Sequence, residues 1–589
     1  MATVRLTING KNVVATEDNS ILDVCKKNGV NIPTLCTHPD LNDEGNCRMC
    51  VVEVDGEEEL LASCNTKVKD KMVVRTETER IKDSRKATLE LLIANHPNDC
   101  LTCDKVAGDC ELQNLCYQYD VNRKEQLLET LPQKEVLDLS STSITRDINK
   151  CIVCGNCVRV CSETQDIGIY DYTERGHDTV INTKEKEPIS ETDCINCGQC
   201  IKVCPVGALV EKNDIHRVRA AINDPNVHVV VQTAPAVKHT LGEEFGLEPG
   251  TDVTGQTNAA LRKLGADKVF STDFTADLTI MEEGTEFIDR IQKGEKLPLL
   301  TSCSPGWVKY VEHNHPRLLE NVSSCKSPQQ MFGALSKSYY AEINDLEPQK
   351  IFSLSIMPCT AKKFEADREE LKVNDLKDVD AVLTTRELAK MIKMEKIQFA
   401  KLDVESFDNF LGDHTSAGRI FGTTGGVMEA ALRTVAWKLS EGKLDKIEYE
   451  GVRGLTNAKE AEIKIADMKV KIAVVHGTAA AKELMKKIEN GEKQYHFVEI
   501  MGCIGGCING GGAPIPDSME TVKKRMAGIY KTDGNSTLRR SHENPLISKL
   551  YDNYLGQPGG HKAHDLLHTH YIDRSTKNVD VRGEHDDNN

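Results

Sequence analysis

The first residues of the chain alternate between apolar and polar positions on both sides of Asn9-Gly10, in the stretch TVRLTINGKNVVA. This alternation around an Asn-Gly pair predicts two antiparallel strands joined by a two-residue turn. The next stretch, SILDVCKKNGV, has apolar residues at helical spacing, and we expect Ser20 as its N-cap and Gly29 as its end. The chain therefore begins with a predicted hairpin that is followed by a helix.

Beyond residue 213 the pattern changes to apolar, β-branched runs, each followed by a loop and usually by a helical pattern. This order predicts an α/β fold with a buried parallel sheet. The runs interpreted as strands are residues 227–232, 268–273, 297–300, 351–357, 380–385 and 471–477. Between the two regions, residues 79–95 are expected to form a helix, and the charged stretch 117–145, which has no cysteine, is expected to be a connector.

Size and charge narrow the possible classes of protein. At 589 residues the chain exceeds the length at which a single core stops growing, so several domains are expected. Its net charge of -17 would repel phosphate backbones and anionic lipid, so nucleic acid is not an expected partner. No apolar run reaches the roughly 20 residues needed to span a bilayer, and the start MATVRLTING lacks a secretory signal. We expect a cytoplasmic protein without membrane segments.

Cysteine is the most informative residue type, because 22 cysteines in a large acidic chain indicate metal binding rather than disulfides. The spacing C-x2-C-x2-C-x3-C occurs twice, and Pro205 follows the second copy. This is the spacing of bacterial ferredoxins, in which the distant fourth cysteine ligates the partner 4Fe-4S cluster. Zinc suits an isolated CxxC pair but does not account for two such copies. The predicted ligands are Cys151, Cys154, Cys157, Cys161, Cys194, Cys197, Cys200 and Cys204.

A further group of cysteines follows the predicted hairpin and helix. Its members, with C-x10-C-x2-C-x13-C spacing, are Cys36, Cys47, Cys50 and Cys64. The spacing resembles the plant-type 2Fe-2S ferredoxin domain, in the form found in complex I-type subunits. A β-grasp-like 2Fe-2S domain is therefore predicted, with a zinc ribbon as the structural alternative.

The stretch HPNDCLTCDKVAGDC carries another candidate cluster site. Its predicted ligands are His96, Cys100, Cys103 and Cys110. The stretch resembles the His-ligated 4Fe-4S site of hydrogenases and complex I, in which a neutral imidazole replaces one thiolate. Six residues separate Cys103 from Cys110, one more than the family spacing, so Cys116 is a weaker candidate for the third cysteine. Together these motifs predict four relay clusters in a row.

Three cysteine-bearing loops follow apolar runs in the second half: TSCSPGW at 301, MPCTAKKFEAD at 357 and EIMGCIGGCINGGGAP at 499. In open α/β sheets, sites form beyond the carboxyl ends of strands, so these loops are expected to converge on one pocket. The glycines of the third loop allow close backbone approach to a bulky ligand.

These loops resemble the family patterns TSCCPxW, MPCxxKxxE and ExMxCxxGCxxGGGxP of iron-only (FeFe) hydrogenases, in the same order and over nearly the whole chain. The resemblance implies an H-cluster, in which a 4Fe-4S cube is joined through one cysteine to a two-iron unit that carries CO, cyanide and a dithiolate amine. It implies Cys359, Cys503 and Cys507 as cube ligands, with Cys507 as the bridge. It also places Lys362 beside a cyanide, Met357 and Met501 against the two-iron unit, and Ala234 and Pro235 around the other cyanide.

The first loop departs from the family pattern. In TSCCP the second cysteine ligates the cube and the first carries protons, so Cys303 falls on the proton position and Ser304 on the ligand position. Three explanations stay open: a serine alkoxide ligates iron; Cys303 moves onto the cube and Ser304 or water relays protons; or the cluster is labile and activity weak. The resemblance extends the proton path from Cys303 through Glu283 and Ser323 to Glu286, although a solvated helix face is the simpler interpretation of the two glutamates.

We therefore predict a multidomain α+β and α/β chain. The expected parts are a β-grasp 2Fe-2S ferredoxin-like domain (1–78), a His/Cys 4Fe-4S domain (79–118), a connector (119–145), a bacterial-ferredoxin-like domain with two 4Fe-4S clusters (146–212), a two-lobed α/β hydrogenase domain (213–572) and a solvated tail (573–589). The remaining cysteines, Cys25 and Cys325, are expected to pack in cores.

The implied function is reversible reduction of protons to H2. The resemblance implies electrons from ferredoxin or from an NAD(P)-linked flavoprotein partner. No G-x-G-x-x-G motif follows a strand, so any NAD(P)H coupling is expected on that partner. The alternatives are an Fe-S electron-transfer subunit, a hydrogen sensor and an Fe-S assembly factor of the same superfamily, with weak or no catalysis because of Ser304.

Overall fold

The computed structural model describes residues 2–105, 110–122, 137–409, 411–412, 414–443, 446–465 and 468–575. The chain divides into two compact units. The first comprises Met1–Thr192 and Gln199–Val210, and the second comprises Asp193–Gly198 and Glu211–Asn589. Among the described residues, no helix is long and apolar enough to cross a membrane.

The first unit begins with a five-stranded sheet of order β2-β1-β5-β3-β4. Its strands are β1 (Thr3–Ile8), β2 (Lys11–Thr16), β3 (Val51–Val54), β4 (Leu61–Ala62) and β5 (Val73–Arg75). The predicted hairpin is confirmed, because β1 pairs antiparallel with β2 across Asn9-Gly10. Helix α1 (Ile21–Lys27) is confirmed as well, with Ser20 as its N-cap in a capping box.

The rest of the first unit is built from short elements. They are α2 (Glu79–Ala94), α3 (Glu111–Gln118), β6 (Leu137–Asp138), β7 (Ile144–Asp147), α4 (Asn156–Arg159), β8 (Tyr170–Thr173), β9 (Val180–Thr183), α5 (Gln199–Lys202) and β10 (Leu209–Glu211). Strands β10, β7 and β6 form a sheet, so part of the stretch expected as a connector belongs to a folded element. These strands are two to four residues long, too short for a periodic signal. Residues 123–136 of the connector lie outside the described residues.

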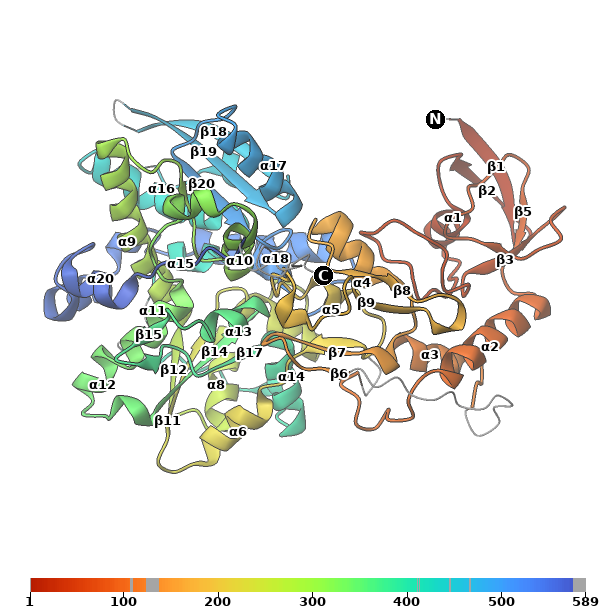
Figure 1. Ribbon diagram of the computed structural model, residues 1–589, viewed down its shortest axis with the longest axis horizontal. Coiled ribbons are helices and arrows are strands. Elements are labelled where there is room, and N and C mark those ends of the chain that lie inside the picture. The colour runs from red at the N-terminus through yellow and green to blue at the C-terminus, as the bar shows by residue number, and fades with distance from the viewer. Residues whose placement is uncertain are drawn as a thin grey trace, which may run out of the picture. The chain divides into compact units, whose positions relative to one another are not determined.

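Two sheets organise the second unit, drawn one above the other in Figure 1. The first has the order β12-β11-β14-β17 and is parallel throughout. The second has the order β13-β20-β19-β18, with β18 antiparallel. The strands are β11 (His228–Thr233), β12 (Lys268–Ser271), β13 (Leu299–Leu300), β14 (Ile351–Met357), β17 (Ala381–Thr384), β18 (Ala458–Ile465), β19 (Met468–His476) and β20 (Phe497–Met501), and β15 (Lys372–Val373) pairs with β16 (Leu376–Lys377). The two sheets give the predicted α/β lobes.

Helices cover both sheets and fill the space between them. The longest, α9 (Thr272–Lys293), packs against α11, α15 and α16. The helices are α6 (Ile215–Asn223), α7 (Val237–Thr240), α8 (Thr254–Leu264), α10 (Pro305–Asn314), α11 (Pro328–Ser336), α12 (Tyr339–Ile343), α13 (Ala361–Ala366), α14 (Thr385–Met394), α15 (Ser416–Ile420), α16 (Gly426–Leu439), α17 (Thr478–Glu489), α18 (Met519–Gly534), α19 (Pro545–Leu550) and α20 (His561–Leu567).

The expected tail is partly attached to the second unit. The guanidinium of Arg574 donates from Nε to the carboxylate of Glu312 at 2.9 Å, so residue 573 does not mark the start of a wholly solvated segment. A buried carboxylate on α10 holds this arginine, a contact that the local sequence does not indicate. Residues 576–589 lie outside the described residues.

Candidate active site and metal centres

The four cysteines predicted to hold a 2Fe-2S cluster lie together beside the N-terminal sheet. The hydrogen bond from the Cys47 thiol lowers the pKa of Cys36, and that from Cys64 lowers the pKa of Cys50, while the same two bonds raise the pKa of Cys47 and of Cys64. Backbone amides of this loop also point at sulfur, as Leu35 N donates to Cys47 Sγ at 3.4 Å. Four cysteine side chains that lie close enough to exchange hydrogen bonds, in a loop whose amides donate to sulfur, fit an Fe-S cluster.

The cysteines of the predicted His/Cys site are also neighbours. Burial raises the pKa of Cys110, and the charges of Cys103 and Cys100 raise it further. His96 follows the end of α2, where its amide donates to Ile93 O at 3.1 Å. Cys116, the weaker candidate, is buried in α3. Residues 106–109 lie outside the described residues, so ligation at this site stays a prediction.

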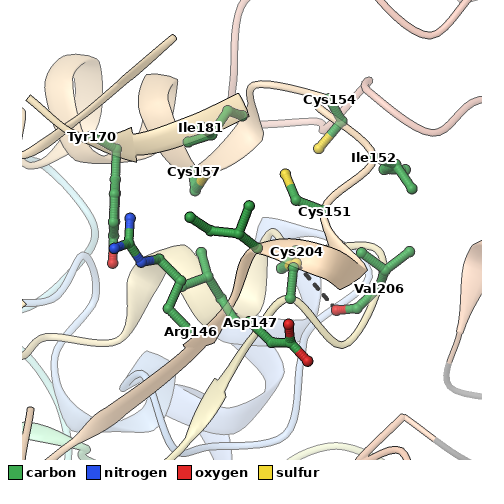
Figure 2. Close-up of a pocket in the computed structure, with 13 residues that line it drawn as sticks. Arg146, Asp147, Cys151, Ile152, Cys154, Cys157, Tyr170, Ile181, Cys204 and Val206 are labelled. Atoms are coloured by element: carbon green, nitrogen blue, oxygen red, sulfur yellow. Dashed lines mark hydrogen bonds between the residues drawn. The ribbon is translucent and has the colours of Figure 1, made fainter. Parts of the chain in front are cut away.

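A cavity of about 20 Å³ separates four sulfurs of the bacterial-ferredoxin motifs. Figure 2 shows Cys151, Cys154, Cys157 and Cys204 around it, with Cys204 Sγ donating to Val206 O at 3.1 Å. The other lining is mostly apolar, including Ile148, Ile152, Ile181 and Leu209. Three consecutive motif cysteines and the distant fourth of the other motif are the set that crossed ligation of a cubane requires. We call this the junction site.

The 2Fe-2S and His/Cys sites both adjoin the junction site. Burial raises the pKa of Cys154, with further contributions from Cys204, Cys151 and Cys36 of the 2Fe-2S group. On the other flank, Cys103 Sγ lies only 2.7 Å from the position of a Cβ on Gly207. Two sites that are successive in sequence thus both adjoin the junction site, so the spatial order of the predicted sites does not simply follow their order along the chain.

In the second unit, the three cysteine loops follow the carboxyl ends of β13, β14 and β20, as predicted. Burial raises the pKa of Cys507 to about 12, with an added contribution from the charge of Cys503. The charges of Cys503 and Cys507 also raise the pKa of Cys359. The three predicted cube ligands therefore lie within electrostatic reach of one another. A Cβ on Gly510 would lie 2.1 Å from Pro358 O, so glycine is required where the third loop crosses the second.

A cavity of about 60 Å³ lies beside these thiols. Its lining contains six predicted residues, Ala234, Pro235, Cys303, Met357, Lys362 and Met501, together with Cys359 and Cys507. Sequence reasoning missed Thr272, Ala276, Gln329, Phe421 and Gly422, which line it as well. These residues come from other helices and loops, and no metal-ligand spacing marks them.

Lys362 is held in place by the glutamate of its own motif. Its Nζ donates to Glu365 Oε2 at 2.9 Å and to Ser327 Oγ at 2.8 Å. Both partners are buried, so the ammonium is fixed at the cavity wall with its charge compensated. This contact explains why the pattern MPCxxKxxE needs its last residue.

The first loop places its two candidate residues differently. Cys303 lines the cavity, where burial raises its pKa and the charges of Glu283 and Cys507 add to the shift. Ser304 is the N-cap residue of α10, and its Oγ accepts a hydrogen bond from Gly502 N at 3.1 Å. Gly502 immediately precedes Cys503 in the chain, so the serine hydroxyl lies against the loop of the cube ligands.

A series of polar side chains leads from Cys303 to the surface. Glu283 on α9 is fully buried; burial and the neighbouring Glu286 raise its pKa to about 8, whereas a hydrogen bond to Ser323 opposes the shift. Ser323 Oγ donates to Glu286 Oε2 at 2.8 Å. Glu286 pairs with Arg290 at 2.7 Å, and both line a surface hollow of about 560 Å³. The structure thus brings all four residues of the predicted path together, and the solvated-face interpretation fails for Glu283.

Comparison with known proteins decides the family. Residues 227–511 match the C-terminal domain of the iron only hydrogenase large subunit. The NADP-reducing hydrogenase subunit HndD of Solidesulfovibrio fructosivorans is 47% identical over 98% of this chain and 100% of that protein. The chain belongs to the iron-only hydrogenase family.

Other matches cover the remaining parts of this hydrogenase. Residues 519–574 match the iron hydrogenase small subunit, 1–79 a 2Fe-2S iron-sulfur cluster binding domain, 85–125 the NADH-ubiquinone oxidoreductase-G iron-sulfur binding region and 150–208 a 4Fe-4S dicluster domain. Iron hydrogenase 1 of Clostridium pasteurianum is 43% identical over 96% of this chain and 99% of its own length. The apo FeFe-hydrogenase HydA1 from Chlamydomonas reinhardtii superposes with a TM-score of 0.56 at 42% identity, over 61% of this chain and 99% of its own.

Proposed function

We propose that this iron-only hydrogenase interconverts protons and H2 at the cavity beside Cys359, Cys503 and Cys507, with electrons delivered through the first unit. One observation carries the proposal: this thiol-bordered cavity adjoins a series of buried acidic and hydroxyl side chains that ends at the surface. When bound, an H-cluster would supply the two-electron redox chemistry that interconverts protons and H2. The protein's residues hold that cluster, keep water away from it and move protons.

Cluster binding is assigned to the three loops. Cys359, Cys503 and Cys507 would hold a 4Fe-4S cube, and Cys359 and Cys507 both line the cavity. The family resemblance implies that Cys507 is the one shared with the two-iron unit. Met357 and Met501, the last residues of β14 and β20, would pack on that unit. Lys362 would donate to a cyanide, and the backbone around Ala234 and Pro235 would surround the other.

Ser304 is proposed as the fourth cube ligand. Its hydroxyl lies next to the Cys503 loop, whereas Cys303 lies in the cavity near Glu283, which supports the first of the three explanations. Alkoxide is a harder ligand than thiolate, so this cube would differ in potential from an all-cysteine one. We expect Ser304→Ala to lose iron from the cube and Ser304→Cys to retain it. Full iron retention in Ser304→Ala would contradict ligation by the hydroxyl.

Proton transfer is assigned to Cys303, Glu283, Ser323 and Glu286. Because burial holds the pKa of Glu283 near 8, its carboxyl group is protonated at neutral pH and can donate toward the cavity. Ser323 passes a proton between Glu283 and Glu286 by rotation of its hydroxyl, and Glu286 exchanges with water in the surface hollow.

Electron delivery is assigned to one 2Fe-2S cluster and three relay 4Fe-4S clusters. Cys161, Cys194, Cys197 and Cys200 are proposed as the remaining ligands of the bacterial-ferredoxin motifs. An NAD(P)-linked flavoprotein partner is the favoured electron donor, supported by the name of the relative that spans nearly the whole chain, and ferredoxin is the alternative. Mixing the matured protein with each reduced donor, and comparing the initial rates of H2 formation, separates the two.

Infrared spectroscopy of the matured protein tests the central proposal. Bands of metal-bound CO and cyanide, together with H2 evolution from reduced viologen, are expected. Cluster-loaded protein that shows neither the bands nor the activity would overturn the proposed function. Bands without activity would retain the cofactor assignment but remove the proposed proton path.

A further inference from the structure

Arg159 lies between the two last cysteines of the first bacterial-ferredoxin motif, in the stretch CVRVC, and ends helix α4. An arginine on a short helix is expected to extend into water, because its guanidinium is costly to bury without a partner. This one is only 2% exposed. What surrounds the buried charge therefore indicates what the charge does.

The guanidinium bonds to the backbone of two different cluster sites. Its Nη2 donates to Cys36 O at 2.7 Å and to Cys154 O at 3.3 Å. Cys36 belongs to the 2Fe-2S group, and Cys154 belongs to the junction site. Asn156 Oδ1 accepts from the same nitrogen at 2.6 Å, and Asn42 O accepts from Nη1. Both terminal nitrogens of the guanidinium are therefore held by hydrogen bonds.

Carboxylate compensation of this charge is incomplete. The salt bridge of Arg159 is with Glu44, whose Oε2 lies 3.6 Å from Nε and whose side chain is 37% exposed. Glu44 Oε2 also accepts from Tyr172 OH at 2.9 Å and from Asn46 Nδ2 at 2.7 Å, which divides its charge among several donors. Asp43 also interacts electrostatically with Arg159, and carbonyl oxygens provide most of the remaining contacts. The buried cation thus retains a field that acts on both flanking sites.

We propose that Arg159 is a shared electrostatic tuning residue that raises the reduction potentials of the 2Fe-2S cluster and the junction cluster together. Reduction adds negative charge to a cluster, and a fixed cation nearby stabilises the reduced form. A cation that touches ligand residues of both clusters raises both potentials in the same direction. Shifts of similar size would leave the potential difference between the two clusters, which sets the driving force for electron transfer, nearly unchanged. The inference rests on the proposed function, because it requires clusters at both sites.

The test is a redox titration of the full-length matured protein, monitored by electron paramagnetic resonance. We expect Arg159→Gln to lower each midpoint potential by at least about 59 mV. For a one-electron couple this shift is a tenfold change in the reduction equilibrium constant. Arg159→Lys retains the charge and is expected to leave both equilibria within threefold of wild type. Arg75→Gln, which removes an exposed cation paired with Asp55, is the charge control and is expected to shift neither.

Glu44→Gln provides an independent variant at a partly exposed position, in case Arg159→Gln does not fold. It removes the counter-charge of Arg159, so both potentials are expected to rise by a severalfold change in equilibrium. The proposal would be overturned if either variant shifted the midpoint potential of only one cluster. It would also be overturned if neither potential shifted.

The magnetic interaction between the two clusters distinguishes tuning from bracing. It depends on their separation, so it is expected to remain unchanged in Arg159→Gln and Arg159→Lys. If the interaction were lost equally in both variants, Arg159 would be a brace between the two sites and the proposal would be wrong. Wild-type protein without reducible clusters would overturn the proposed function as well, whereas normal wild-type signals that Arg159→Gln leaves unshifted would overturn this inference alone.

Discussion

The junction site of the first unit and the cavity of the second unit are both bordered by cysteine sulfur, but their other walls differ. The sulfurs of the junction site come from the ferredoxin motifs, and its other lining is mostly apolar, with Arg146, Asp147 and Tyr170 also in the wall. The cavity of the second unit has the Cys303 thiol and the Lys362 ammonium in its wall, and the proposed proton path begins at Cys303. A site that only passes electrons does not need a proton path, whereas a site that makes H2 must be connected to the surface by one. Variants that interrupt the path should therefore lower H2 formation at the cavity without changing the junction site.

The largest effect is expected from Cys507→Ala. Loss of the ligand that we propose is shared by the cube and the two-iron unit should lower H2 evolution from reduced viologen by at least about a thousandfold, while the relay clusters remain. Iron content per chain and activity are the measurements. Cys25→Ala, which removes a buried thiol from the N-terminal core, is the matched control and should retain activity. Activity above a tenth of wild type would contradict the shared-ligand role.

Glu283→Gln should lower activity by about 10²- to 10⁴-fold without changing iron content, because the amide cannot relay a proton. Glu295→Gln on the rim of the surface hollow is the control and should behave as wild type. A small effect of Glu283→Gln would show that water alone supplies the cavity.

The pH profile sharpens the same prediction. Burial raises the pKa of Glu283 to about 8, so its neutral, donating form persists through neutral pH and is lost above it. Wild-type proton reduction is expected to fall as the pH passes about 8. Comparison of the rates between pH 6 and 9 should show a flatter profile in Glu283→Gln than in wild type.

Glu286→Gln should have a smaller effect, of about tenfold, because Glu286 already borders the hollow and water can replace it in part. The same activity assay measures it. An effect as large as that of Glu283→Gln would place the slow proton transfer at the surface end of the path. Ser323→Ala, between the two glutamates, is expected to fall between them.

The smallest effect concerns stability. Asp277 on α9 is fully buried, and burial raises its pKa to about 7 against hydrogen bonds from Thr415. A carboxyl group with a raised folded-state pKa contributes stability below its unfolded value near 4, and that contribution is lost as the pH rises through about 7. The upper limit is roughly 4 kcal/mol for three pKa units.

Asp277→Asn removes this titration. The unfolding temperature of the second unit should fall between pH 5 and pH 8 in wild type, and by less in the variant. Asp403→Asn, at an exposed position, is the control and should retain the wild-type slope. Equal slopes in all three proteins would assign the pH dependence to other buried acids.

Local patterns predicted the features that depend on a few consecutive residues. The hairpin at Asn9-Gly10, the Ser20 cap and the parallel strands β11, β14 and β17 follow from spacing and capping chemistry. Strand β18 was not predicted, because its sequence AKEAEIKI alternates with charges and contains no apolar run. The bounds of β20 were not among the predicted runs, although the third cysteine loop was expected to follow an apolar strand.

Contacts between distant segments were beyond local patterns. Phe421 and Gly422 reach the catalytic cavity from the turn between α15 and α16, and no ligand spacing announces them. The adjacency of Cys36 to Cys154 and of Cys103 to Gly207 is likewise a property of packing, which is why the order of clusters along the chain was a poor guide to their order in space. The roles of the thiols themselves came from family resemblance and from motif spacing.

The position of Cys204 beside Cys151, Cys154 and Cys157 has a consequence for biosynthesis. A nascent chain that has emerged from the ribosome only as far as the first motif lacks the fourth sulfur of its junction site. Iron delivered at that moment would meet an incomplete set of thiolates that is open to solvent and oxygen. The complete set of four sulfurs for this site therefore exists only after translation has passed the second motif, which would couple the loading of the two proposed ferredoxin-type clusters in time.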